Sequence, residues 1–142
     1  MQIKQLSLFV ENRTGAVTGI CNCLKDNGID IRTLCIADTE QFGIIRLLVK
    51  DNAKAEKVLA AAGFAAKTTE VFALLVPDVP GGLAGILNVF DRRGVAVEYM
   101  YAVTFGKAGK AVIVFSFADP EKAAQVIREE GLETASEIDI FK

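Results

Sequence analysis

Residues 8–20 read LFVENRTGAVTGI, and residues 74–86 repeat the pattern as LLVPDVPGGLAGI. In both stretches an apolar run ends at a four-residue break, a glycine follows (Gly15 or Gly81), and an amphipathic segment begins. Each stretch predicts a strand, a tight loop and the start of a helix. Self-similarity on this scale indicates two copies of one module.

The repeat extends over almost the whole chain. Adding 66 to a position in the first half gives its counterpart, and adding 68 does so after two extra residues at 106–110. We therefore expect one domain at residues 1–70 and a second at 71–142. The segment 65–76 has to supply both the last strand of the first domain and the first strand of the second. Either one long bent strand is shared by two sheets, or residues 136–141 provide the closing strand of one half. The shared strand is the simpler arrangement.

Each half predicts the element order β-α-β-β-α-β. Asp51 and Asp119 are typical helix caps, Pro120 occupies a tolerated first helical position, and Gly63 ends a helix. The expected strands cover residues 3–10, 29–37, 44–49, from about 65, 95–103, 111–117 and 134–141, and the expected helices begin near 16, 52, 83 and 120. Units of this kind form antiparallel sheets with both helices on one face. The fold class is therefore α+β, with two ferredoxin-like βαββαβ repeats whose antiparallel sheets pack side by side.

Composition excludes several partners. A net charge of −2 and a pI near 5.2 provide no basic surface for nucleic acid or anionic lipid. No apolar run approaches the ~20 residues of a membrane helix, and the amino terminus lacks the basic and apolar regions of a signal peptide. We expect a cytoplasmic protein that binds neither nucleic acid nor membrane.

Enzymatic chemistry is also disfavoured. The chain has no histidine, the commonest general base at neutral pH. Its cysteines are Cys21, Cys23 and Cys35, and the first two are two positions apart on a predicted helix, so they point to different sides. We expect no catalytic residue, no metal and no cofactor.

Two further features resemble nucleic-acid binding surfaces but have simpler interpretations. Phe115 and Phe117 alternate on a strand, yet the whole strand is apolar, so we expect both in the core or in a sheet-edge contact. Arg92 and Arg93 are interpreted as a helix end, and the lysines of 107–110 as a solvated hairpin.

The loops after the first strand of each half are the best candidate sites. Gly15, Gly81 and Gly82 permit backbone conformations that a Cβ would obstruct. The following helix presents unpaired N–H groups that suit a carboxylate. Asn12 and Asp78 precede these helices, and two interpretations are open: they are turn or N-cap residues, or they bind the α-groups of an amino acid.

The run Asp78-Val79-Pro80-Gly81-Gly82-Leu83 resembles the opening motif of an ACT domain. The run Glu11-Asn12-Arg13-Thr14-Gly15-Ala16-Val17 is similar to the regulatory domain of bacterial phosphoglycerate dehydrogenase, in which the asparagine contacts the effector serine. A second asparagine of that family corresponds to Asp30. The resemblance covers essentially the whole chain.

The chain departs from that pattern at a few positions. Thr14 replaces the usual proline and Asp30 replaces an amide, while Ala96 occupies the position of Asp30 in the second half. We therefore expect the first-half loop to be the better site, with Met100 and Tyr101 contributing a wall. The resemblance implies as ligand-binding residues Asn12, Arg13, Thr14, Gly15, Ala16, Val17, Asp30, Asp78, Pro80, Gly81, Gly82, Leu83, Met100 and Tyr101.

The function implied by the resemblance is that of a regulatory protein. Such domains pair, and effectors bind at the loops and the seam between domains. No catalytic domain accompanies the pair here, so the chain is expected to bind a free amino acid and to modulate a separate enzyme of amino-acid metabolism, as a homodimer. The alternative is a protein-interaction subunit that binds no small molecule.

Overall fold

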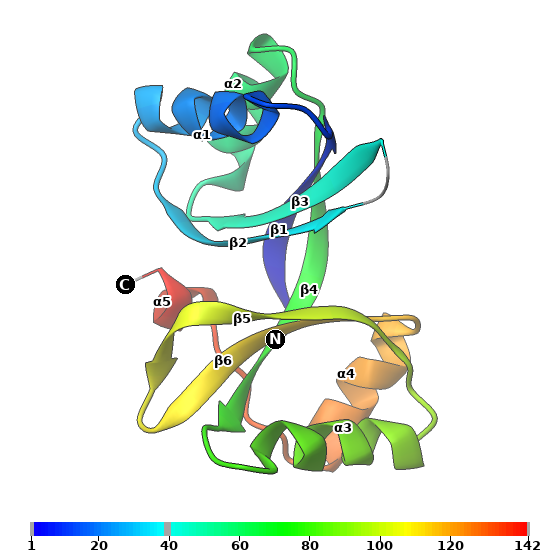
Figure 1. Ribbon diagram of the computed structural model, residues 1–142. Coiled ribbons are helices and arrows are strands. Elements are labelled where there is room, and N and C mark those ends of the chain that lie inside the picture. Colours follow the sequence, from blue (N-terminus) through cyan, green and yellow to red (C-terminus); the bar gives the residue numbers. More distant parts are fainter. Residues whose placement is uncertain (1, 39–40, 142) are drawn as a thin grey trace. The chain divides into compact units, whose positions relative to one another are not determined.

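A computed structural model describes residues 2–38 and 41–141 (Figure 1). The chain forms two compact units: the first-repeat unit contains Lys4–Glu70 and Phe141, and the second-repeat unit contains residues 71–140 together with residues 2 and 3. In chain order the elements are β1 Gln2–Glu11, α1 Ala16–Asp26, β2 Ile31–Asp38, β3 Phe42–Val49, α2 Asn52–Ala61, β4 Ala66–Pro77, α3 Gly82–Arg92, β5 Val97–Lys107, β6 Lys110–Phe117, α4 Pro120–Glu129 and α5 Glu137–Ile140.

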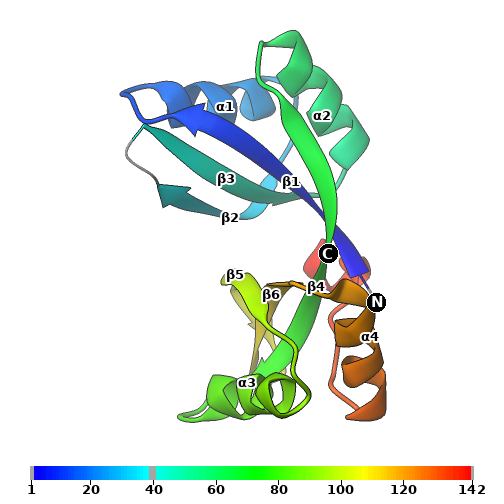
Figure 2. The same ribbon diagram turned by 90° about the vertical axis from the view of Figure 1, so that its right-hand side faces the viewer.

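The first-repeat unit has strand order β4-β1-β3-β2 with both helices on one face, as its βαββαβ sequence predicts (Figure 1, Figure 2). β3 pairs antiparallel with β1 and with β2. Side chains alternate between the two faces of a strand, so one face of β1 and β3 packs under α1 and α2. The fully buried side chains of this core include Leu6, Leu8, Ile20, Leu24, Ile45, Leu47 and Leu59.

The second-repeat unit repeats this order around β4-β6-β5, again antiparallel. Its core contains a cluster of aromatic rings, including a Phe90–Phe117 pair with centroids 4.5 Å apart. Phe115 and Phe117 are 0% and 2% exposed. The expectation that they enter the core is confirmed, and neither ring is available to stack on a base.

β4 continues without interruption from Ala66 to Pro77 and lies between β1 and β6 in the hydrogen-bonded order. The prediction of one long strand serving both halves is therefore confirmed. The alternative, a closing strand at 136–141, is wrong because that segment contains α5.

The expected strand at 134–141 is also wrong for most of its length. Thr134 makes an isolated antiparallel bridge to Leu74, with backbone bonds on either side of it. The chain then turns into α5, because Ser136 and Asp139 form a capping box. Ser136 N donates to Asp139 Oδ2 at 3.0 Å, and Asp139 N donates to Ser136 Oγ at 3.3 Å.

Two helices are capped as the sequence predicts. The Asp51 carboxylate accepts from Lys54 N at 3.0 Å at the start of α2. The Asp119 carboxylate accepts from Lys122 N at 3.1 Å at the start of α4, where Pro120 is the first helical residue. These side chains satisfy N–H groups that would otherwise lack partners.

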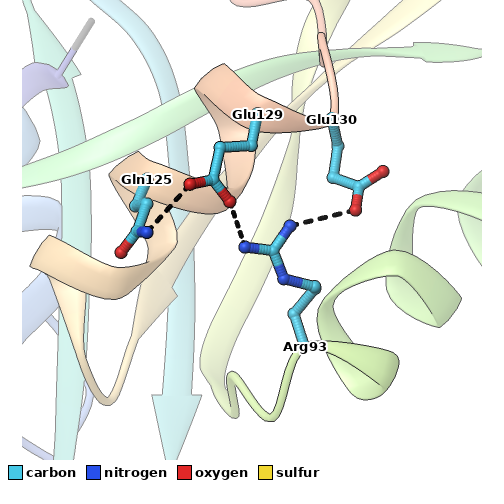
Figure 3. Close-up of polar contacts among 4 residues, drawn as sticks. All are labelled: Arg93, Gln125, Glu129 and Glu130. Carbon is cyan, nitrogen blue, oxygen red and sulfur yellow. Dashed lines mark hydrogen bonds and ion pairs between the residues drawn. The ribbon is translucent and has the colours of Figure 1, made fainter.

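An ion-pair network connects the ends of α3 and α4 (Figure 3). The Arg93 guanidinium donates to Glu130 Oε1 at 3.0 Å and also binds the carboxylate of Glu129, which accepts from Gln125 Nε2 at 2.9 Å. The two carboxylates raise the pKa of Arg93, and the bonds from Gln125 and Arg93 lower the pKa of Glu129. The expected helix end at Arg93 is thus also a link between two helices.

The acid stability of α5 provides a testable prediction. Lys107 Nζ and the Ser136 backbone and hydroxyl donate to Asp139 and lower its pKa to about 2. A carboxyl whose folded-state pKa is depressed stabilises the fold above its unfolded pKa, and this contribution is lost as pH falls through the folded value. We expect the stabilising contribution of Asp139 to be complete above about pH 4 and to decline as the pH falls to its folded-state pKa of about 2.

This titration is measurable by NMR of the Asp139 carboxyl carbon. Glu137, which is exposed on the same helix, serves as the internal control. A midpoint for Asp139 close to that of an ordinary aspartate would contradict the capping and ion-pair geometry.

Candidate functional site

The first candidate loop joins β1 to α1. Asn12 N donates to Gln41 O at 3.0 Å, which ties the loop to the end of the β2–β3 connection. Ala16 N then donates to Arg13 O at 3.3 Å, and Gly15 takes the N-cap position with φ 90°. Residues 12–15 are exposed, whereas Ala16 is buried and Val17 packs against the core.

The second loop, between β4 and α3, has the same backbone arrangement. Asp78 N donates to Gly109 O at 3.3 Å, and Gly82 N donates to Val79 O at 3.0 Å. Gly81 is the N-cap with φ 84°. Asp78, Pro80 and Gly81 are exposed, while Gly82 and Leu83 are half-buried. Two stretches with different side chains thus form one loop structure.

Both loops lead into helices without a side-chain cap. The N-caps are glycines, so neither Asn12 nor Asp78 serves as an N-cap residue. By contrast, aspartates cap α2 and α4. Glycine at this position leaves first-turn N–H groups, which carry partial positive charge, without a side-chain acceptor.

Arg13 and Asp30 occupy different surroundings from Asn12. Arg13 Nε lies 2.8 Å from Glu11 Oε2 in an exposed ion pair beside the loop. Asp30 precedes the Ile31–Val49 pair, whereas Asn12 follows the Glu11–Phe42 pair. The eight residues of β3 separate these pairs, so Asp30 and Asn12 lie at opposite ends of the sheet, about 24 Å apart at ~3.4 Å per residue.

Met100 and Tyr101 lie in the middle of β5. Met100 pairs with Phe115 and Tyr101 with Val114, so their side chains point to opposite faces of the sheet. The second loop begins beyond the Pro77–Lys110 pair, several residues further along β6. Within the second repeat, Met100 and Tyr101 therefore lie away from the Asp78 loop, and their expected contribution to a wall at the first loop stays a prediction.

An apolar surface beside the first loop was not identified from the sequence. Phe42 pairs with Glu11 directly before the loop, and Phe9 pairs with Ile44 on the same helix-free face of the sheet. Phe9 is 76% exposed and Phe42 is 49% exposed. In the sequence, the only sign of this surface is an aromatic residue at an outward-facing position of β1 and of β3. At the position of Phe42, the second repeat has Lys110.

The cysteines form no cluster. Cys21, Cys23 and Cys35 are free thiols, and the described residues contain no group of three or more His, Cys, Asp or Glu side chains suited to a metal ion. Burial raises the pKa of Cys35, although the neighbouring Arg46 acts in the opposite direction. No helix within residues 2–38 and 41–141 is long and apolar enough to span a membrane.

Comparison with known proteins identifies the same architecture. The sequence matches the family described as "ACT domain pair" over residues 1–142. A comparison with curated proteins finds no match. Among solved structures, protein BT0572 from Bacteroides thetaiotaomicron is 36% identical with a TM-score of 0.90, covering 100% of this chain and 97% of that one.

More distant structures share the fold. The ligand-free regulatory subunit of aspartate kinase from Thermus thermophilus is 15% identical with a TM-score of 0.61, and the alignment covers 88% of each chain. The corresponding subunit from Thermus flavus is 15% identical with a TM-score of 0.56, covering 89% of this chain and 90% of that one.

The second loop depends on a close backbone approach. A Cβ placed on Gly82 would lie 1.9 Å from Pro77 O, whereas a Cβ on Gly85 in the same helix would meet nothing within 4 Å. We expect Gly82→Ala to destabilise the protein by about 1–3 kcal/mol through this clash. Gly85→Ala should instead stabilise it by roughly 0.5–1 kcal/mol, because alanine is the better helix former.

Urea denaturation of the two variants tests this contrast. The free energy of unfolding should change in opposite directions. Equal changes in both variants would show that helix propensity alone decides the effect and that the loop can relax around a side chain.

Proposed function

Because the chain belongs to the ACT domain pair family, we propose that it is a regulatory protein that binds a free amino acid at the loop between β1 and α1 and modulates a separate enzyme of amino-acid metabolism. The observation that carries the proposal is the uncapped start of α1 directly behind the exposed Asn12. A helix N-terminus without its own acceptor attracts a carboxylate.

The proposed contacts use complementary groups of an amino acid. The ligand carboxylate accepts from N–H groups in the first turn of α1, beginning at Val17. The Asn12 side chain offers both a donor and an acceptor, so it can bind either α-group. Gly15 lets the ligand approach the backbone, since it has no Cβ.

The surroundings of the first loop favour a ligand with an apolar side chain. Phe42 lies across β1 from the last residue before the loop, and Phe9 follows on the same face. Burying these partly exposed rings against an apolar side chain would be favourable at ~25 cal/mol per Å². A charged side chain would lose solvation on burial against these rings.

The second loop is the poorer site in this proposal. Asp78 places a carboxylate where the first repeat has the neutral Asn12, and like charge repels the carboxylate of an amino acid. Lys110, which replaces Phe42, is already paired with Glu133 at 2.6 Å. We therefore assign ligand binding to the first repeat.

A homodimer is the part of the proposal that gives Asp30 a role. β2 lies at the edge of the strand order, with Leu34 and Ile36 exposed at 42% and 47%. If two copies paired antiparallel through β2, the start of one strand would lie beside the end of the other. Asp30 of one copy would then approach the Asn12 loop of the second copy and could accept from the ligand's α-ammonium.

A non-catalytic role is part of the proposal. The fold likeness to regulatory subunits of aspartate kinase supports it only by analogy, since one fold serves many functions. The absence of histidine from the sequence agrees with it.

A thermal-shift screen against the twenty amino acids tests the function. A ligand that binds only the folded state raises Tm, by about 5–10 °C at a hundred times its Kd. We expect the largest shifts with aromatic and branched aliphatic amino acids. Asn12→Ala should weaken binding about tenfold or more, because it removes bonds to a charged group.

Phe42→Lys introduces the residue of the second repeat and should reduce the preference for apolar ligands. Ile138→Ser, which changes a residue 78% exposed in the other unit, is the matched control. Flat melting curves at millimolar concentrations of every amino acid would contradict the sensor and favour a protein-interaction subunit.

The variant Asp30→Ala distinguishes a site that a second copy completes from a site formed by one chain alone. Its ligand affinity should fall if a second copy completes the site, and the loss should disappear under conditions in which light scattering shows a monomer. Unchanged affinity in a dimeric Asp30→Ala variant would exclude a shared site while leaving amino-acid binding intact.

A further inference from the structure

The loop at Asp78 is held by the tip of the β5–β6 hairpin. Asp78 N donates to Gly109 O at 3.3 Å, and Ala108 and Gly109 form the hairpin turn with φ of 51° and 75°. The last pair of the hairpin is Lys107 opposite Lys110. Any movement of this turn therefore moves the acceptor of the Asp78 amide.

Two acidic residues bind the two lysines beside the turn. Lys107 Nζ lies 2.7 Å from Asp139 Oδ1, and Lys110 Nζ lies 2.6 Å from Glu133 Oε1. Like charges directly opposite each other on paired strands are destabilising. The carboxylates compensate this repulsion, so the hairpin is exposed as expected and its lysines are also ion-paired.

Both acids belong to one segment that is fixed independently. Leu75 N donates to Glu133 O at 2.9 Å, and Ala135 N donates to Ala73 O at 2.9 Å. The capping box of α5 then orients Asp139, and Ile140 is fully buried. Figure 1 shows α5 on the opposite side of β5 and β6 from α3. We call residues 133–140 the C-terminal strap.

In the first repeat the segment that follows the second helix is the strand β4, whereas in the second repeat it is the strap. Two ion pairs near the first loop and α1, Arg13–Glu11 and Lys25–Asp26, each join residues close in sequence. Asn12 N nevertheless donates to Gln41 O at 3.0 Å in the same way. The first repeat therefore provides the matched comparison for the loop without the strap.

We propose that the C-terminal strap is a positioning device: it fixes the β5–β6 hairpin through Lys107 and Lys110, and the hairpin in turn fixes the Asp78 loop. The loop of the second repeat is preformed, and releasing the strap allows it to open. The loop of the first repeat opens independently of the strap. The proposal goes beyond ligand binding and does not depend on it.

Hydrogen exchange resolved by NMR on the ligand-free full chain tests the proposal. In the Glu133→Gln/Asp139→Asn variant the two lysines face each other uncompensated. We expect the Asp78 amide to exchange on the order of 3–10-fold faster, the range given by the loss of two partly exposed ion pairs. The Asn12 amide should exchange at its original rate.

Three further variants define the outcome. Glu133→Gln alone leaves the Ser136–Asp139 contacts in place and should give a smaller increase at Asp78. Exchanging the charges, as Glu133→Lys with Lys110→Glu, should restore slow exchange. Glu137→Gln changes an exposed acid of the strap that takes no part in the Lys107–Asp139 and Lys110–Glu133 ion pairs, and it should change nothing.

Unchanged exchange at Asp78 in the double variant would overturn the proposal. Equal acceleration at Asp78 and Asn12 would also overturn it, because the effect would then be general destabilisation. Neither result bears on amino-acid binding at the first loop, which the thermal-shift screen measures separately.

Discussion

A left-handed glycine at the start of α1 and of α3 is the constraint on which both loops depend. Gly15 O and Gly81 O each accept the first intrahelical bond, from Gly19 N and Gly85 N at 2.9 Å. The helix therefore begins without a side chain that could cap it. An L-residue would be strained at this φ, and the aspartates of α2 and α4 show what a self-capped helix looks like in the same chain. The glycines keep the two helix starts available to an external acceptor.

The two repeats preserve this backbone and differ in what surrounds it. Phe42 stands beside the first loop, whereas Lys110 stands beside the second and is neutralised by Glu133. In both repeats a backbone amide of the loop donates a hydrogen bond to a carbonyl of the neighbouring hairpin. The two repeats thus share one loop geometry and differ in its neighbour, which is an exposed phenylalanine in the first repeat and an ion-paired lysine in the second.

Local patterns predicted most of the fold because its elements follow local rules. The alternation of apolar and polar residues predicted the strands, and glycines and aspartates predicted the helix ends. The repeat itself required β4 to be a strand of both halves. The segment Glu137-Ile138-Asp139-Ile140 was predicted as a strand because its apolar residues alternate with acidic ones. The structure buries Ile140 and leaves Ile138 78% exposed, as one turn of helix does. The Ser136–Asp139 spacing was the signal that should have outweighed the alternation.

The candidate site was less predictable, since spacing in sequence does not reveal which end of a sheet a residue reaches. Asn12 and Asp30 fall at opposite ends because α1 returns the chain before β2 begins. A ligand that contacts both must therefore bind between two copies whose sheets pair antiparallel. Under that arrangement, ligand binding and association are thermodynamically linked: whatever completes the site also stabilises the pair, and each increases the affinity of the other by the same factor. Such coupling would let a small zwitterion, which buries little surface itself, change the surface that the chain presents to an enzyme.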